Sequence, residues 1–193
     1  MAFTSILPLV LCTKVWWIAV LVQLVFLVIV ILALHLLEPF GFYKSLFVEK
    51  ARHEVIISFV LLFGLITILM AVFWGGFGPE YIYVAVCAMM AWGPGDAAAA
   101  IVGKNWGKHK LSGRHIEGVK SVEGSVAMAV TSFLFTFVTL SLMSGLSLPR
   151  VLILLLSIAP VAALVELYTK YGLDTVTVPI VVSLILSVAA LLG

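Results

Sequence analysis

The chain has 193 residues, of which 64% are hydrophobic and only 10% are charged, and its net charge is +2. A soluble domain carries about 25% charged residues, and disordered or nucleic-acid-binding chains carry dense charge. The composition therefore excludes those three classes, and no nucleic-acid partner is expected. We predict a multi-pass integral membrane protein that is surrounded by membrane lipids.

Six apolar segments along the chain approach the length of about 20 residues that a membrane-spanning helix needs. They cover residues 15–37, 55–74, 81–102, 124–143, 151–167 and 176–192. Because they use most of the chain, we predict one membrane-embedded, all-α helix bundle over residues 1–193. The third segment contains Gly93-Pro94-Gly95, and both residue types disfavour a continuing helix. We therefore predict a break at these residues, with Asp96 capping the second half of that helix.

Basic residues are distributed unevenly between the loops that connect these segments. Nine of the eleven fall in the loops after the first, third and fifth segments, and the other loops hold only Lys14 and Arg150. The positive-inside rule places loops rich in Lys and Arg in the cytoplasm, and aromatic residues mark the membrane boundary. We therefore predict that both termini lie on the non-cytoplasmic side, where Trp16, Trp74 and Tyr81 also fall.

Acidic residues gather near the predicted cytoplasmic ends of the last four segments. They are Asp96, Glu117, Glu123, Glu166 and Asp174. Ionisable groups near lipid are costly, so such residues are candidates for function. A carboxylate at a helix break is one way to build an ion or anion site. Simpler interpretations are helix caps at Asp96 and Asp174 and an interfacial acid at Glu166.

The loop after the third segment combines glycines with lysines, in Gly103-Lys104-Asn105-Trp106-Gly107-Lys108 and later in Lys120-Ser121. Glycines let backbone amides approach a phosphate, lysines supply positive charge, and serine hydroxyls donate hydrogen bonds. These cations could equally obey the positive-inside rule or contact anionic lipid. The nearby acids favour a nucleoside triphosphate with Mg²⁺, which prefers one or two carboxylates together with phosphate oxygens.

Several short motifs between residues 92 and 182 follow one another in a recognisable order. They are Gly95-Asp96 before an alanine run, Gly103-x-x-x-Gly107-Lys108, Lys120-Ser121-Val122-Glu123-Gly124-Ser125, Glu166, and Asp174-Thr-Val-Thr-Val-Pro179. This pattern resembles the CTP-dependent polyprenol kinase family, which includes phytol kinase, dolichol kinase and yeast-type diacylglycerol kinase. The family usually has Asn where this chain has Thr175. It is related to CDP-diacylglycerol synthase, whose Pro-Gly-His-Gly-Gly run does not occur here.

The resemblance implies transfer of the γ-phosphate of CTP to a long-chain isoprenoid alcohol of the phytol, geranylgeraniol or dolichol type, at the cytoplasmic membrane face. It implies that Mg²⁺ is held by Asp96, Glu166 and Asp174. It implies catalytic roles for Asp96, Lys120 and Glu123. Glu123 could orient or deprotonate the alcohol, or it could support the residues that contact the substrate. The nucleotide-binding residues that it implies are Gly95, Gly103, Lys104, Gly107, Lys108, Lys120 and Ser121.

Two other functions remain open at this point. A cytidylyltransferase would use CTP to make a CDP-lipid and release pyrophosphate, and a small transporter would consume no nucleotide. The choice of CTP over ATP rests on the resemblance alone. No role is assigned to Arg52, His53 or Arg114, and the short spans leave room for a homo-oligomer that encloses the site.

Overall fold

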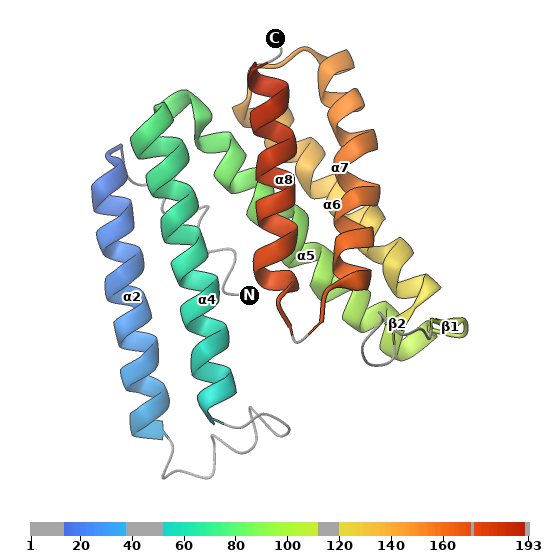
Figure 1. The fold of residues 1–193 in the computed structure, drawn as a ribbon, viewed down its shortest axis with the longest axis horizontal. Helices are drawn as coiled ribbons and strands as arrows, with labels where there is room; N and C mark the ends of the chain where they lie inside the picture. The colour runs from blue at the N-terminus through green and yellow to red at the C-terminus, as the bar shows by residue number, and fades with distance from the viewer. Residues whose placement is uncertain (1–13, 38–51, 112–119, 171, 192–193) are drawn as a thin grey trace.

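Long apolar helices dominate the computed structural model, which describes residues 14–37, 52–111, 120–170 and 172–191. Six helices in this part of the chain are long and apolar enough to cross a membrane, as the sequence predicts. Figure 1 shows them as a bundle whose neighbours run in alternating directions. The helices are α2 (Trp16–Leu37), α4 (Arg52–Met70), α5 (Ile82–Trp106), α6 (Val122–Met143), α7 (Leu148–Tyr168) and α8 (Asp174–Leu191).

Short elements connect some of these helices. A π-helical turn, η2 (Ala71–Phe77), extends α4, and the 3₁₀ turn η3 (Pro79–Tyr81) leads into α5. Two short strands, β1 (Lys110–Leu111) and β2 (Lys120–Ser121), pair antiparallel between α5 and α6. The strand pair therefore sits at the end of the bundle where α5 finishes and α6 begins (Figure 1).

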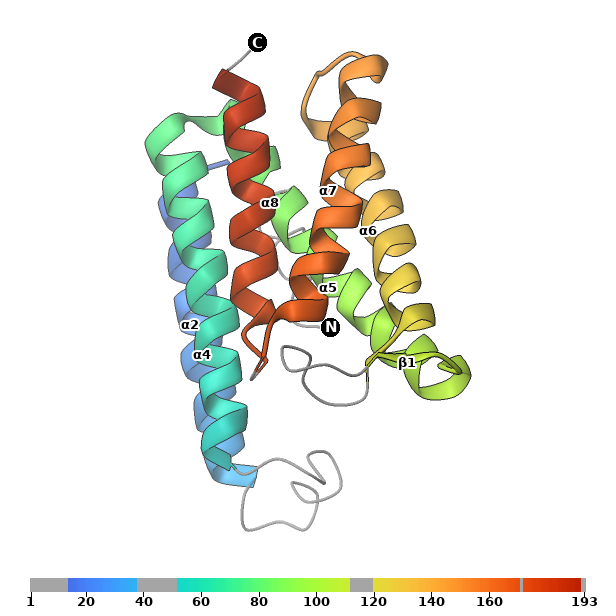
Figure 2. The same ribbon diagram turned by 45° about the vertical axis from the view of Figure 1, so that its right-hand side comes forward.

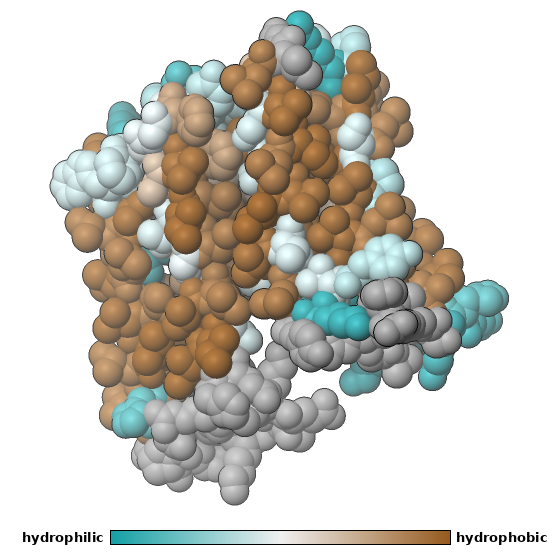
Figure 3. Space-filling view, viewed as in Figure 1, coloured by the Kyte–Doolittle hydropathy of each residue, from teal (hydrophilic) through white to brown (hydrophobic). Residues whose placement is uncertain are grey.

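Helix α5 forms the centre of the bundle. Every residue from Tyr83 to Gly95 is buried, and α5 packs against α6, α8, α7 and α4. Helix α2 contacts mainly α4 and lies at one edge of the molecule, as Figures 1 and 2 both show. Large apolar side chains on α2 face outward, among them Leu21, Val25 and Leu32. Figure 3 shows apolar side chains across the middle of the molecule and hydrophilic ones nearer its two ends, as expected for a lipid-facing surface.

One prediction about α5 is wrong. The helix continues through Pro94, so it is not broken at Gly93-Pro94-Gly95, and Asp96 lies within α5 instead of capping a half-helix. Proline removes an amide donor and frees a carbonyl in the preceding turn. Close to this point Ser132 of α6 donates a hydrogen bond of 2.6 Å to the carbonyl of Ala91. Donors of this kind allow membrane helices to tolerate proline.

Helices α2, α5 and α7 all finish at the same end of the bundle (lower end in Figures 1 and 2). The sequence predicts this grouping from the basic residues of the three loops. Three of those basic residues, Lys44, Lys50 and Arg114, fall outside the described part of the chain. The acidic Glu117 and Leu192, at the end of the sixth predicted segment, also fall outside it. The cytoplasmic location of this end stays a prediction.

Candidate functional site

A cavity of about 500 Å³ opens at the end of the bundle where α5, the strand pair, α6 and α7 meet. Five charged groups of the cavity lining come from elements far apart in the sequence: Asp96 and Lys104 from α5, Lys110 from β1, Lys120 from β2 and Glu166 from α7. The remaining lining residues are small, and they are Ala99, Ala100, Gly103, Gly107, Ser121, Gly124 and Ser125. The cavity thus combines several lysines with two acids beside apolar helices.

The glycines of this region let α5 and α6 pack unusually closely around Ser121. A Cβ atom at Gly107 would lie 2.2 Å from the carbonyl oxygen of Gly103 and 2.7 Å from Ser121 Oγ. A Cβ atom at Gly124 would lie 3.0 Å from the carbonyl oxygen of Ala99. Ser121 Oγ in turn accepts a hydrogen bond of 3.1 Å from the amide of Gly124 and caps α6. Close helix packing is therefore one reason for these glycines, in addition to any contact with a phosphate.

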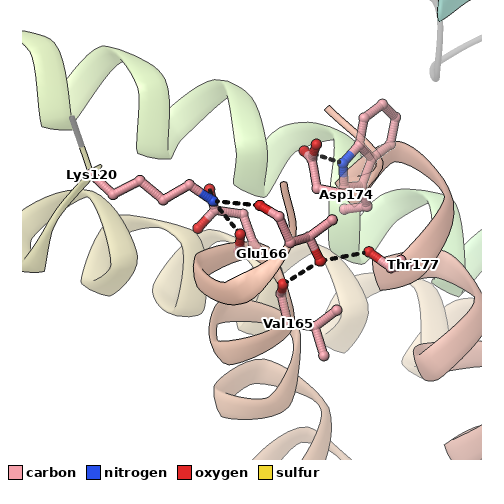
Figure 4. A network of polar contacts seen from close by, with 7 residues as sticks. Lys120, Val165, Glu166, Asp174 and Thr177 are labelled. Carbon is pink, nitrogen blue, oxygen red and sulfur yellow. Dashed lines mark hydrogen bonds and ion pairs between the residues drawn. The ribbon is translucent and has the colours of Figure 1, made fainter. Parts of the chain in front are cut away.

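Lys120 joins the strand pair to the last turn of α7. Its ammonium group lies 2.9 Å from Glu166 Oε1, and it also donates to the main-chain carbonyls of Glu166 and Thr169. A lysine carries three N–H donors, so these contacts engage all of them. A cation here also interacts favourably with the negative end of the α7 dipole. Figure 4 shows Lys120 reaching across to Glu166 in this way.

Asp96 and Asp174 approach each other from α5 and α8. Their carboxyl groups lie within hydrogen-bonding reach, and Asp96 also interacts electrostatically with Glu166 and Lys120. Asp174 Oδ2 accepts a hydrogen bond of 3.2 Å from Trp92 Nε1 of α5, as Figure 4 shows beside the Asp174 label. The first residue of α8 is therefore held by two residues of α5.

Hydrogen bonds within the α7–α8 connection fix the position of Asp174 further. Thr169 Oγ1 lies 2.9 Å from Thr177 Oγ1 and donates to the carbonyl of Val165 at 2.6 Å, and these contacts appear in Figure 4. Gly172 has φ +67°, a left-handed conformation that glycine adopts without strain. The contacts of Thr169 therefore tie the end of α7 to the first turn of α8.

Glu123 contacts His109, whereas the sequence suggests that it acts on the alcohol or supports the site. Its carboxylate accepts hydrogen bonds from the backbone amide of His109 at 3.2 and 3.3 Å. His109 Nδ1 lies 2.7 Å from Glu123 Oε1, and His109 is largely exposed. Glu123 is absent from the cavity lining. Its position indicates that it anchors the end of the α5–β1 loop to the start of α6.

The structure brings most of the predicted site residues to one place. The cavity is lined by Asp96, Gly103, Lys104, Gly107, Lys120, Ser121 and Glu166. Asp174 is not in the lining, but it interacts with Asp96. Gly95, Lys108 and Glu123 are not in the lining. At Gly95 a Cβ atom would lie 2.6 Å from Met128 Sδ, so this glycine serves the packing of α5 against α6.

Two residues of the site were missed by sequence reasoning. Lys110 lines the cavity from β1, and Trp92 donates to Asp174. Trp92 precedes Asp96 by four residues, a spacing that places both side chains on the same face of a helix. This spacing could have linked Trp92 to the site, but a helix predicted to break between the two residues would not place them on one face.

The carboxylates of the site supply part of the ligand set of Mg²⁺, and phosphate oxygens would complete that set. Among the side chains that the structure describes, no group of three His, Cys, Asp or Glu residues is arranged to hold a metal. Two adjacent carboxylates are nevertheless present in Asp96 and Asp174. Mg²⁺ is usually bound by one or two carboxylates plus substrate phosphates, so the donor set fits this ion.

The chain is similar to a phytol kinase over part of its length. It is 39% identical over 93 residues to the phytol kinase of Synechocystis sp., a stretch that covers 48% of this chain and 37% of that relative. The chain thus spans little more than a third of the length of the curated relative it matches. No family model matches the chain, and no solved structure matches it.

Proposed function

We propose that the protein is a lipid alcohol kinase that transfers the γ-phosphate of CTP to a long-chain isoprenoid alcohol. The observation that carries the proposal is the cavity itself, whose lining combines Lys104, Lys110 and Lys120 with Asp96 beside membrane-spanning helices. The similarity to a phytol kinase supports a lipid alcohol kinase. CTP as the donor, the isoprenoid acceptor and the cytoplasmic location of the cavity rest on the sequence resemblance and the loop charges.

The positions of the site residues suggest which of them bind the triphosphate and which bind the metal. Lys104 and Lys110 are the lysines of the lining that remain available to the triphosphate, because Lys120 is engaged by Glu166 and the end of α7. Asp96 and Asp174 would hold Mg²⁺, which neutralises phosphate charge when bound. Glu166, predicted as a third metal ligand, engages Lys120 through Oε1, so it would bind that ion through its other carboxylate oxygen or by giving up the lysine.

The reaction needs no covalent bond between the protein and the substrates. The hydroxyl oxygen of the alcohol forms the new bond to the γ-phosphorus, CDP leaves with the electrons of the broken bond, and the hydroxyl proton passes to a carboxylate of the cavity. Catalysis of this kind depends mainly on positioning and charge stabilisation. The apolar helix surfaces beside the cavity would hold the isoprenoid tail in the membrane while its hydroxyl reaches the nucleotide.

One assay tests the proposal against its alternatives. Purified protein in detergent is given CTP, Mg²⁺ and phytol or geranylgeraniol, and the products are identified. The proposal predicts CDP together with a phosphorylated lipid. Pyrophosphate with a CDP-lipid, formed when phosphatidate is supplied, would indicate a cytidylyltransferase. No consumption of CTP or ATP with any of these lipids would contradict both enzymes and leave the transporter hypothesis.

A further inference from the structure

We propose that Trp92 is a positioning residue that holds the carboxylate of Asp174 against Asp96 and so prepares a divalent-cation site before the nucleotide binds. The inference rests on the proposed function, because the purpose of that cation is to bind the triphosphate. It concerns a residue to which neither the sequence motifs nor the reaction assigns a role.

The position of Trp92 on α5 makes this role possible. Trp92 and Asp96 are four residues apart and therefore occupy one face of the helix on successive turns. Both side chains of this face reach Asp174: the indole Nε1 donates to Oδ2 at 3.2 Å, and the Asp96 carboxyl group lies within hydrogen-bonding reach. Asp174 is thus gripped by α5 at two points, one turn apart.

The chemistry of the indole N–H suits a supporting role. This group donates and cannot accept, so it can fix a carboxylate but cannot be a metal ligand. It engages Oδ2 of Asp174, and a carboxylate has a second oxygen with which it can bind a cation. Two adjacent carboxylates repel each other unless a proton or a cation lies with them. A fixed donor keeps Asp174 in place against that repulsion.

The packing of α5 fixes the direction in which Trp92 points. Trp92 is only 7% exposed. Three residues later Gly95 lies so close to α6 that a Cβ atom would approach Met128 Sδ to 2.6 Å and Ser132 Oγ to 2.7 Å. This close contact prevents α5 from rotating about its axis. The face that carries Trp92 and Asp96 is therefore held toward the start of α8.

The experiment measures metal binding directly, without catalysis. Full-length protein in detergent micelles is titrated with Mn²⁺ alone, an ion that accepts the same oxygen ligands as Mg²⁺, and free Mn²⁺ is followed by electron paramagnetic resonance. Wild-type protein should bind Mn²⁺, and Asp174→Asn should weaken this binding. Trp92→Phe should raise the Kd about 10- to 100-fold, as losses of groups that support metal ligands usually do.

Trp74→Phe is the matched control. Trp74 is buried to nearly the same extent, at 8% exposure, but lies in η2 at the other end of the bundle. Its replacement removes the same group and should leave the Mn²⁺ affinity unchanged. The inference is overturned if Trp92→Phe binds Mn²⁺ within twofold of wild type, or if Asp174→Asn binds it as well as wild type does.

A second measurement covers the case in which Trp92→Phe does not fold. Wild-type protein labelled with ¹⁵N-tryptophan gives indole N–H signals from its five tryptophans. Paramagnetic Mn²⁺ should broaden one of these signals selectively, and Asp174→Asn should remove the effect. Uniform behaviour of all the indole signals would overturn the inference.

The outcomes also separate this inference from the proposed function. Active transfer from CTP together with an unchanged Mn²⁺ affinity in Trp92→Phe would retain the kinase and remove the role of Trp92. Weakened Mn²⁺ binding in Trp92→Phe together with no transfer from CTP to any alcohol would retain the positioning role and remove the kinase.

Discussion

Lys120 and Glu166 form an ion pair of 2.9 Å that connects the strand pair after α5 to the last turn of α7. Both side chains are largely shielded, with exposures of 21% and 11%. Lys120 also donates to the main-chain carbonyls of Glu166 and Thr169. Lys120, which the sequence suggests as a phosphate ligand, therefore also stabilises the end of α7, the helix that precedes Asp174.

Removing one partner of this pair should destabilise the protein. Glu166→Gln leaves the ammonium group of Lys120 without its carboxylate, and breaking a buried pair in this way costs several kcal/mol. Because this pair is only partly shielded, we expect a loss of about 1–3 kcal/mol. Thermal unfolding in detergent measures this loss of stability. The double variant Lys120→Met with Glu166→Gln should lose less than the sum of the single variants, and simple additivity would contradict the coupling.

Asp96→Asn should abolish phosphoryl transfer while leaving the protein folded. The substitution removes one of the two adjacent carboxylates and keeps the shape of the side chain. We expect a loss of about 100- to 1000-fold in kcat, the scale associated with one preorganised electrostatic group. Size-exclusion profile and helical content should match wild type. Arg150→Ala is the control. Arg150 lies in the first turn of α7, at the end opposite Glu166, and its replacement should reduce kcat little. Wild-type turnover by Asp96→Asn would remove Asp96 from the site.

Replacements of Glu123 distinguish an anchor from a catalytic base. The side-chain oxygen of Glu123→Gln can still accept from the His109 amide, so an anchor predicts nearly normal kcat. Glu123→Ala loses that bond, which is worth about 1 kcal/mol, and should raise the KM for CTP several-fold through a loosened loop. Steady-state kinetics at varied CTP separates the two parameters. A large fall in kcat for Glu123→Gln would support the base and contradict the anchor.

Gly107→Ala should disrupt the loop that borders the cavity. The new methyl group would meet backbone at 2.2 Å, at the carbonyl of Gly103, and cannot be relieved by a side-chain movement. We expect destabilisation of about 1–3 kcal/mol and weaker CTP binding, measured by thermal unfolding and by the KM for CTP. Gly64→Ala is the matched control, since nothing lies within 4 Å of its Cβ position in α4. It should be neutral or stabilising by about 0.5–1 kcal/mol.

Hydropathy and charge predicted the six spans because each depends on a local run of apolar residues. The convergence of Asp96, Lys120 and Glu166 could also be predicted, since the sequence places all three near the same predicted ends of the spans. The break at Pro94 could not be judged locally: whether a helix tolerates proline depends on what the neighbouring helix supplies, here the Ser132 hydroxyl group.

The direction of a single side chain was equally inaccessible. Glu123 and Ser121 belong to one motif, yet Ser121 lines the cavity and Glu123 turns to His109. The difference follows from their places at the start of α6, where Ser121 is the cap and Glu123 belongs to the first turn. A motif shows which residues belong together, and only the packed helices decide which of them face the cavity.

Asp174 stands at the beginning of α8, whereas Asp96 and the lysines of the cavity precede it by many residues. During synthesis the membrane must therefore receive α8 before the second carboxylate can join the first. A nascent chain halted after α7 would already present the basic cavity, but it would lack half of its acidic pair. The pair of carboxylates should thus form only once α8 has entered the membrane.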